Sequence, residues 1–201
     1  MKTTKLMTIA LCAVACTAAT ATAEEKGDDL IASATPTVTI ADPVNPKPGM
    51  VFKGYNVEYI YGRKFGELPS VLQKAPAVKT TVVTTEKFSF EDLNSDQLGQ
   101  GVWEGFLKCK RSANCTFVVK QSSPNGAGYI LIVNGKRIIC GWGQHSATVD
   151  MKAGFNHIKL ISQTRSPIYI SLKATGSTRE PKPLTPKDMF YDDKPDEGDV
   201  F

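Results

Sequence analysis

The sequence lacks most of the motifs that identify catalytic and metal-binding proteins. It has two histidines, His145 and His157, and neither has a second metal-type residue at ligand spacing. His157 alternates with Lys159, which predicts a solvated strand face. A Gly-x-Ser-x-Gly sequence, a cysteine beside a plausible histidine and a phosphate-cradling loop are absent. The carboxylates, Glu104 among them, form no pair that the sequence can place across a substrate. We therefore expect no catalytic residue, no metal and no cofactor.

Long hydrophobic runs are lacking except near the N-terminus. Residues 6–16 are apolar, follow two lysines and precede Ala21-Thr22-Ala23, which is the pattern of a secretory signal peptide cleaved before Glu24. The run is too short to span a bilayer, so it predicts export to the periplasm, the cell surface or the medium without a transmembrane segment. Lipid attachment at Cys16 is the alternative, although the residue three positions earlier is Ala rather than the usual Leu.

Neither positive nor negative charge is in large excess. The formal net charge of +4 falls to +2 when residues 1–23 are removed, because they contain two lysines and no acid. A chain so close to neutral is not expected to bind nucleic acid. Acids are concentrated only in Tyr191–Phe201, which indicates a solvated flexible tail.

Cysteines are few, and none forms a Cys-x-x-Cys pair. Three remain after the predicted signal peptide: Cys109, Cys115 and Cys140. Cys109 and Cys115 flank a short turn between two strand-like runs, which predicts a disulfide in an oxidising compartment. Closing so short a loop contributes about 2 kcal/mol on the chain-entropy model. Cys140 alternates with Ile138 and Trp142, so we expect it to pack in the core as a reduced thiol.

A sustained helical period is also missing, and short strand-like segments are present instead. They are rich in β-branched and aromatic residues and are separated by turn residues. These segments are 57–61, 80–84, 87–90, 102–108, 116–121, 129–133, 137–140, 147–151, 157–162 and 168–172. The pattern predicts an all-β, antiparallel sandwich or barrel in a single domain. We expect a Pro/Thr-rich arm or linker over 24–47, the β-domain over 48–191 and the acidic tail over 192–201.

Residues 128–142 contain the clearest β-hairpin signal. Tyr129, Leu131 and Val133 alternate with their neighbours, and Asn134-Gly135 supplies two residues that tolerate positive φ in a tight turn. An extended run resumes after the turn, so a hairpin is predicted here.

Several short motifs follow one another in a recognisable order. They are Pro48-Gly49-Met50 with Tyr55, Tyr59 and Tyr61, then Val102–Leu107, Cys115–Phe117, Tyr129–Lys136, Lys152–Leu160 and Pro183–Tyr191. In this order they resemble the PA14 family, the β-sandwich module named after the anthrax protective antigen and found in glycosidases, toxins and adhesins. The resemblance covers roughly residues 48–191 and implies a PA14-like β-sandwich.

The chain departs from the family in the loop before the apolar strand. Sugar-binding members of the family place two adjacent Asp residues there, which hold a Ca²⁺ that binds sugar hydroxyls. Here residues 121–128 contain no carboxylate, whereas Ca²⁺ takes six to eight oxygen ligands, several of them charged in a tight site. We therefore expect any ligand binding to be independent of calcium.

Two loops supply the candidate ligand-binding residues. Tryptophan between two glycines, followed by Gln and His, could form an aromatic platform with polar neighbours, although core packing is the alternative for this Trp. The candidates are Ser122, Ser123, Asn125, Asn134, Trp142, Gln144 and His145. Plain turn chemistry is the alternative for the serines and for Asn125.

Two classes of function remain open. The first is an exported, non-catalytic module that binds a glycan or cell-surface polysaccharide. The second is a structural or assembly protein that docks a protein partner through its arm or its tail.

Overall fold

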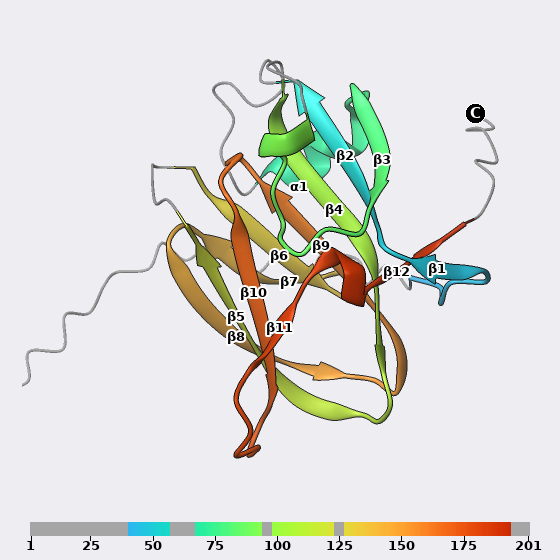
Figure 1. Cartoon of the computed structure of the whole chain (residues 1–201), viewed down its shortest axis with the longest axis vertical. Coiled ribbons are helices and arrows are strands. Elements are labelled where there is room, and N and C mark those ends of the chain that lie inside the picture. The colour runs from blue at the N-terminus through green and yellow to red at the C-terminus, as the bar shows by residue number, and fades with distance from the viewer. Residues whose placement is uncertain (1–39, 57–66, 94–97, 123–126, 194–201) are drawn as a thin grey trace, which may run out of the picture. The chain divides into compact units, whose positions relative to one another are not determined.

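The structure is a computed structural model that describes residues 40–56, 67–93, 98–122 and 127–193. These residues are mostly in strands, with one short α-helix and short 3₁₀ segments (Figure 1). The strands are β1 (Pro46–Pro48), β2 (Met50–Asn56), β3 (Lys79–Val83), β4 (Leu98–Cys109), β5 (Ala113–Gln121), β6 (Tyr129–Val133), β7 (Lys136–Gly141), β8 (Gln144–Met151), β9 (Gly154–Ser162), β10 (Ile168–Ala174), β11 (Lys182–Leu184) and β12 (Phe190–Asp192). The helix α1 is Leu68–Lys74.

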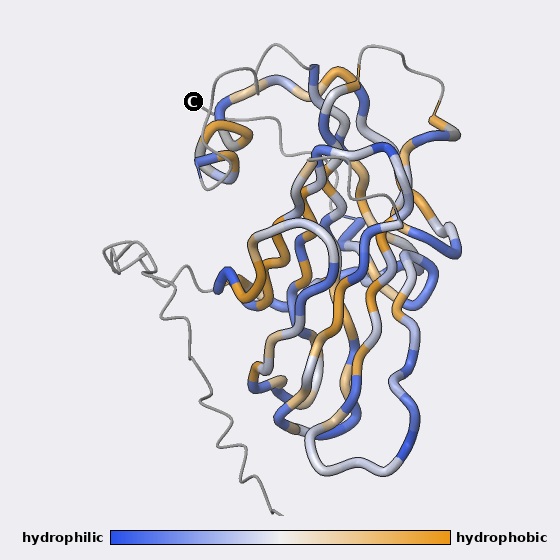
Figure 2. The backbone as a smooth tube through the Cα atoms, turned by 90° about the vertical axis from the view of Figure 1, so that its left-hand side faces the viewer, coloured by the Kyte–Doolittle hydropathy of each residue, from blue (hydrophilic) through white to orange (hydrophobic). Residues whose placement is uncertain are grey.

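The strands form two antiparallel sheets. The larger, sheet A, has the order β1-β12-β4-β9-β6-β7, with β2 pairing with β4 and β3 with β2. The smaller, sheet B, has the order β11-β10-β5-β8. Hydrophobic side chains from both sheets make one core cluster, which includes Trp103 and Leu160 of sheet A and Phe117 and Ile170 of sheet B. The predicted antiparallel β-sandwich is therefore confirmed, and Figure 2 shows its hydrophobic residues along the strands and its hydrophilic residues in the connecting loops.

Trp103 lies at the centre of the core. Its ring centroid is 5.1 Å from that of Phe52 and 6.0 Å from those of Phe88 and Phe90. Gly101 lies directly against this cluster: an added Cβ would come within 2.8–2.9 Å of aromatic carbons of Phe52, Phe90 and Trp103. The close approach of these rings to the backbone therefore depends on glycine at this position.

A second, smaller cluster lies on the other face of sheet A, under α1. Leu68 and Leu72 of α1, one helical turn apart, pack with Val102, Ile130 and Ile161. This helix was not identified from the sequence, which shows no sustained helical period. With seven residues, α1 is too short to produce a sustained period, and a proline in its first turn supports its start.

The predicted hairpin is present, but the side-chain directions predicted for its second strand are wrong. Asn134 and Gly135 have φ of 48° and 78° and form the turn. Leu131 pairs with Ile139 while Ile132 pairs with Arg137, so Ile138 is an additional residue on β7. This bulge changes the alternation: Ile139 lies in the core, whereas Cys140 is exposed.

The predicted disulfide is not formed, and Cys109, Cys115 and Cys140 are all free thiols. The disulfide was expected because the two cysteines flank a short turn between two strand-like runs. In fact β4 belongs to sheet A and β5 to sheet B, so the turn crosses from one sheet to the other. Stacked sheets are about 10 Å apart, which separates the two backbones. Burial raises the pKa of the Cys109 and Cys115 thiols, which lowers their reactivity.

His157 is buried, contrary to the solvated position predicted for it. Its side chain is 7% exposed, and its Nε2 donates a hydrogen bond of 2.8 Å to Glu104 Oε1. Lys159 Nζ lies 3.2 Å from the other carboxylate oxygen. Phe106, whose ring centroid is 5.5 Å from the imidazole, covers His157 from the neighbouring strand. A short row of charges therefore crosses the outer face of sheet A.

The chain enters and leaves the sandwich on adjacent strands. β1 pairs with β12 in the register Pro46↔Asp192, Lys47↔Tyr191 and Pro48↔Phe190. The backbone N–H groups of Val44 and Asn45 donate to Asp192 Oδ1 at 3.2 and 2.9 Å. An ion pair between Lys47 and Asp193 lies beside these bonds. In the described residues, no helix is long and apolar enough to cross a bilayer.

Candidate functional site

Trp142 is the most exposed aromatic side chain among the described residues. It is 66% exposed and lies in the loop between β7 and β8. The core position that remained an alternative for it is therefore wrong. An exposed indole offers a flat apolar face and one N–H donor, which suits stacking against a ring that also carries polar groups.

The loop that carries Trp142 is held in place by hydrogen bonds from three residues. The Tyr129 hydroxyl lies 3.2 Å from the carbonyl oxygens of both Gly143 and Val119. The backbone N–H of Gln121 also donates to the Gly143 oxygen at 3.0 Å, and His145 Nε2 lies 2.8 Å from the Trp142 oxygen. Burial raises the pKa of Tyr129 to about 12, so its hydroxyl stays protonated and available as a donor. The Trp142 side chain is thus displayed on a backbone that is already ordered.

A second exposed aromatic side chain, Tyr169, lies on the outer face of sheet B at the same end. It is 52% exposed and sits directly across from Lys120, which in turn sits across from Gln144. Directly opposed residues share one face of a sheet, so these three side chains form a row across β10, β5 and β8. Gln144 is two residues from Trp142, and the row therefore extends the aromatic surface with one cation and one amide.

Tyr169 and Lys120 were missed by the sequence analysis. Tyr169 stands between the buried residues Ile168 and Ile170, a pattern that marks its side chain as outward-facing. This pattern predicts that Tyr169 is exposed, but it does not predict which side chains lie beside it. The proximity of Tyr169 to Gln144 depends on the register of β10 with β5 and of β5 with β8, which the sequence does not reveal.

Of the other predicted site residues, some lie at this end of the sandwich and some lie outside the described residues. Ser122 is exposed and lies at this end, where its N–H donates to the Pro167 oxygen at 3.0 Å. His145 is exposed and packs edge-on to Tyr129 with ring centroids 6.2 Å apart. Ser123 and Asn125 lie outside the described residues.

Asn134 is not part of this surface. It stands at the opposite end of β6 from Tyr129, in the hairpin turn. Its side chain donates to Asn156 Oδ1 and accepts from the His157 N–H, both at 2.9 Å. These bonds fix the turn, and they leave Asn134 a structural role.

Metal ligands are not gathered at this site or elsewhere in the described ranges. No group of three or more His, Cys, Asp or Glu side chains there could hold a metal ion. The polar groups at the aromatic end are instead an amide, an ammonium group and a hydroxyl, from Gln144, Lys120 and Ser122. Such groups can donate and accept hydrogen bonds directly to a ligand.

Comparison with solved structures places the fold. The PA14 domain of the antifreeze protein MpAFP superposes with a TM-score of 0.50 at 12% identity, covering 77% of this chain and 96% of that one. The chain has a PA14-type fold. The A domain of epithelial adhesin 9 from Candida glabrata, solved in complex with Galb1-3GlcNAc, gives a TM-score of 0.53 at 10% identity, covering 76% of this chain and 94% of the adhesin domain.

An anti-sigma factor domain-containing protein is also similar to this chain. It superposes with a TM-score of 0.53 at 17% identity over 76% of this chain. The match spans only 50% of the length of that protein. No family model matches the sequence, and no curated protein does. At these identities the structural likeness establishes the fold and leaves the function to be argued from the site.

Proposed function

We propose that this chain is an exported, non-catalytic module that binds a glycan through the aromatic end of its sandwich, defined by Trp142, Tyr169, Lys120 and Gln144. The observation that carries the proposal is the exposed indole of Trp142 on a loop fixed by hydrogen bonds. Sugar rings have apolar faces of axial C–H groups and polar edges of hydroxyls. An exposed indole matches the face, and an amide with an ammonium group matches the edges.

The order of the Trp142 loop contributes to affinity in this proposal. A binding loop that is ordered before the ligand arrives loses less conformational entropy on binding. The glycan complex of the epithelial adhesin 9 A domain supports the proposal by analogy, because that domain has the same fold. The proposed export rests on residues 1–23, and the proposed domain limits of 48–191 rest on the PA14-like motifs.

The binding is proposed to be independent of calcium. Residues 121–128 contain no carboxylate, so the loop offers no charged oxygen to the ion. Recognition would rest on stacking and direct hydrogen bonds, and chelation by EDTA should leave it unchanged.

A glycan array tests the proposal, with wild type and three variants measured with and without EDTA. Wild type should bind a defined set of glycans in both conditions. Trp142→Ala and Tyr169→Ala should each weaken binding about tenfold, which corresponds to about 1.4 kcal/mol and is typical of a lost stacking contact. Gln144→Ala should weaken it by a smaller factor, because a net hydrogen bond contributes about 1 kcal/mol.

The matched control is Val82→Ala, which removes a 43%-exposed hydrophobic side chain from β3 in sheet A. It should leave binding unchanged. All four variants should keep the wild-type melting temperature within about 2 °C, because the altered side chains are exposed. Absence of any glycan signal from the folded wild type would contradict the proposal and favour docking of a protein partner on the arm or tail.

A further inference from the structure

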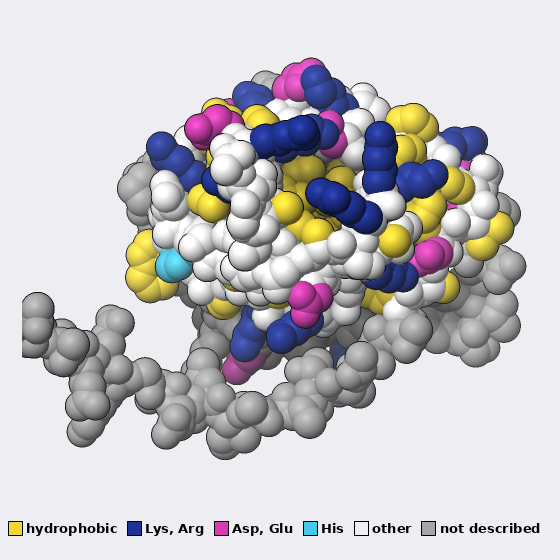
Figure 3. Space-filling model, turned by 90° about the horizontal axis from the view of Figure 1, so that it is seen from below, with side chains coloured by type: hydrophobic (Ala, Val, Ile, Leu, Met, Phe, Trp, Pro, Cys, Tyr) yellow, Lys and Arg dark blue, Asp and Glu magenta, His cyan; other side chains and the backbone are white. Residues whose placement is uncertain are grey.

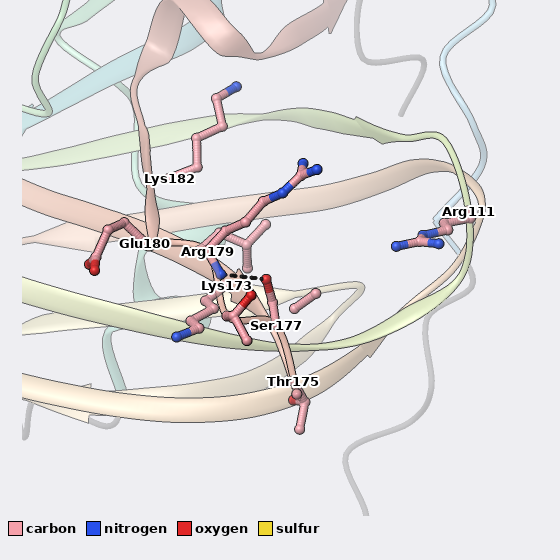
Figure 4. A pocket seen from close by; sticks show the side chains of 11 residues that line it. Arg111, Lys173, Thr175, Ser177, Arg179, Glu180 and Lys182 are labelled. Atoms are coloured by element: carbon pink, nitrogen blue, oxygen red, sulfur yellow. Dashed lines mark hydrogen bonds between the residues drawn. The ribbon is translucent and has the colours of Figure 1, made fainter.

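The end of the sandwich opposite Trp142 carries a hollow surrounded by basic side chains. It has a volume of about 600 Å³ and lies between the β4–β5 turn and the β10–β11 connection. Its lining includes Arg111, Lys173, Arg179 and Lys182 (Figure 4). Figure 3 shows the same end from below, with Lys and Arg side chains spread around hydrophobic atoms in the depression.

Most of the cations at this hollow have no acidic partner among the described residues. Within the described residues, Arg111, Lys173 and Arg179 form no ion pair, whereas Lys182 pairs with Asp188 at 3.2 Å. Glu180 is the one acid in the lining. In the view of Figure 4, the Arg111 and Arg179 side chains extend toward each other from different loops. Like charges held on facing loops repel, and an anion between them would remove that repulsion.

The other groups of the lining also fit an anionic ligand that carries hydroxyls. Thr175, Ser177 and Thr178 line the hollow between the basic residues. The Ser177 hydroxyl accepts a hydrogen bond of 3.1 Å from the Arg179 N–H, which holds the loop and leaves the hydroxyl hydrogen free to donate. Arginine guanidinium groups bind carboxylates and sulfates through two parallel hydrogen bonds.

We propose that this hollow is a second binding site, specific for an acidic polysaccharide that carries carboxylate or sulfate groups. Three features select this ligand class. The cations come from separate segments, which matches a chain with spaced charges, and the hollow is within the size range of small-ligand sites. No aromatic side chain lines it, so it lacks the stacking platform with which proteins bind single-stranded nucleic acid.

The proposal is independent of the aromatic end. Arg111 precedes the first residue of β5, whereas Lys120 is at the other end of this nine-residue strand. Nine residues of strand extend about 25–30 Å, so one sugar ring cannot contact both places. Each site can therefore be removed while the other is retained.

Binding to heparin, polygalacturonate and neutral dextran tests this site by calorimetry or biolayer interferometry. Wild type should bind the two acidic polymers and not dextran, and raising NaCl from 50 to 500 mM should weaken binding at least tenfold, because salt screens exposed charges. The double variant Arg111→Gln/Arg179→Gln should reduce binding at least tenfold, since it removes both facing guanidinium groups.

The charge-matched control is Lys53→Gln/Lys74→Gln, which removes two exposed cations from β2 and α1. It should retain binding within about twofold, because the site and not the net charge sets affinity. Trp142→Ala should also retain binding to the acidic polymers. An equal loss in both double variants would overturn the proposal in favour of non-specific charge attraction. Equally tight binding of a single-stranded DNA oligonucleotide would overturn the specificity for polysaccharide.

Discussion

Glu104 shows how burial and charge are balanced at a single residue. Burial of its carboxylate would raise its pKa, but the hydrogen bond from His157 and the nearby ammonium group of Lys159 outweigh this and lower the pKa to about 2. The ionised form therefore stabilises the folded state. That contribution is complete above the unfolded pKa of about 4.5 and is lost as pH falls through about 2.

The variant Glu104→Gln should lower the free energy of unfolding by about 1–3 kcal/mol at pH 7, because it removes a charge-assisted hydrogen bond from a buried histidine. The difference from wild type should shrink as pH falls from about 4.5 to about 2. Urea unfolding at pH 7, 4 and 2.5 measures this. Glu86→Gln is the control, since its exposed pair with Lys187 should contribute less than about 1 kcal/mol. A difference that stays constant with pH would show that Glu104 acts through packing alone.

Residue-level prediction from the sequence succeeded at the hairpin turn and failed just beyond it. Asn134-Gly135 was predictable because few residue pairs tolerate positive φ at two successive positions. Cys140 was assigned to the core by continuing the alternation of Ile138. The bulge at Ile138 breaks that alternation, and no local sequence signal marks it. Trp142 was named as a binding candidate, and its exposure excludes the core position that remained the alternative for it.

At the scale of elements, the fit between sheet A and its aromatic cluster depends on Gly101. The variant Gly101→Ala should destabilise the protein by about 1–3 kcal/mol, because its Cβ would lie within 2.9 Å of three aromatic side chains. Urea titration followed by tryptophan fluorescence measures the midpoint. Shortening Phe90 to Leu in the same chain should recover part of the loss, since it frees space beside the new methyl group. An unchanged midpoint in the single variant would mean that the rings move apart at no cost.

The positions of strands along the sequence were predicted better than the pairing between strands. β6 has the limits predicted from its alternation, because one face packs in the core and the strand ends at a turn. β2 and α1 were missed: β2 lies at the start of the predicted domain, just before the first predicted strand segment, and α1 is too short for its period to be seen. The pairing of β10 with β5 joins segments about 50 residues apart, so the position of Tyr169 across from Lys120 could not be predicted from either segment.

At the scale of the whole molecule, a net charge close to neutral does not reveal that basic and aromatic residues occupy separate surfaces. Basic residues gather around the hollow at one end of sheet B, and exposed aromatic residues lie at the other. The net charge is summed over both ends, and it therefore did not indicate a charged partner. The fold separates them because Arg111 lies just before the start of β5, whereas Lys120 lies near the end of that strand.

The paired ends of the domain yield a prediction about Asp192. Asp192→Ala should remove the acceptor of the Val44 and Asn45 N–H groups and loosen β1, with a cost of about 1 kcal/mol. Amide hydrogen exchange at Asp193, whose N–H donates to the Asn45 oxygen at 3.2 Å, should become faster, while the melting temperature changes by a few degrees at most. A wild-type rate of exchange at Asp193 in this variant would show that the strand pairing alone holds the arm.

The pairing of β1 with β12 also determines how the domain would respond to a mechanical load. In the antiparallel register Pro46↔Asp192, the outer ends of both strands lie at the same end of the pair. A pull on both ends of the domain would therefore open the contacts one after another, like a zipper, instead of loading them together in shear. Only three residues of β1 pair with β12, so few bonds resist the opening. The arm would peel away at low force and lengthen the chain between the two points of attachment, while the sandwich and both proposed binding sites remained folded.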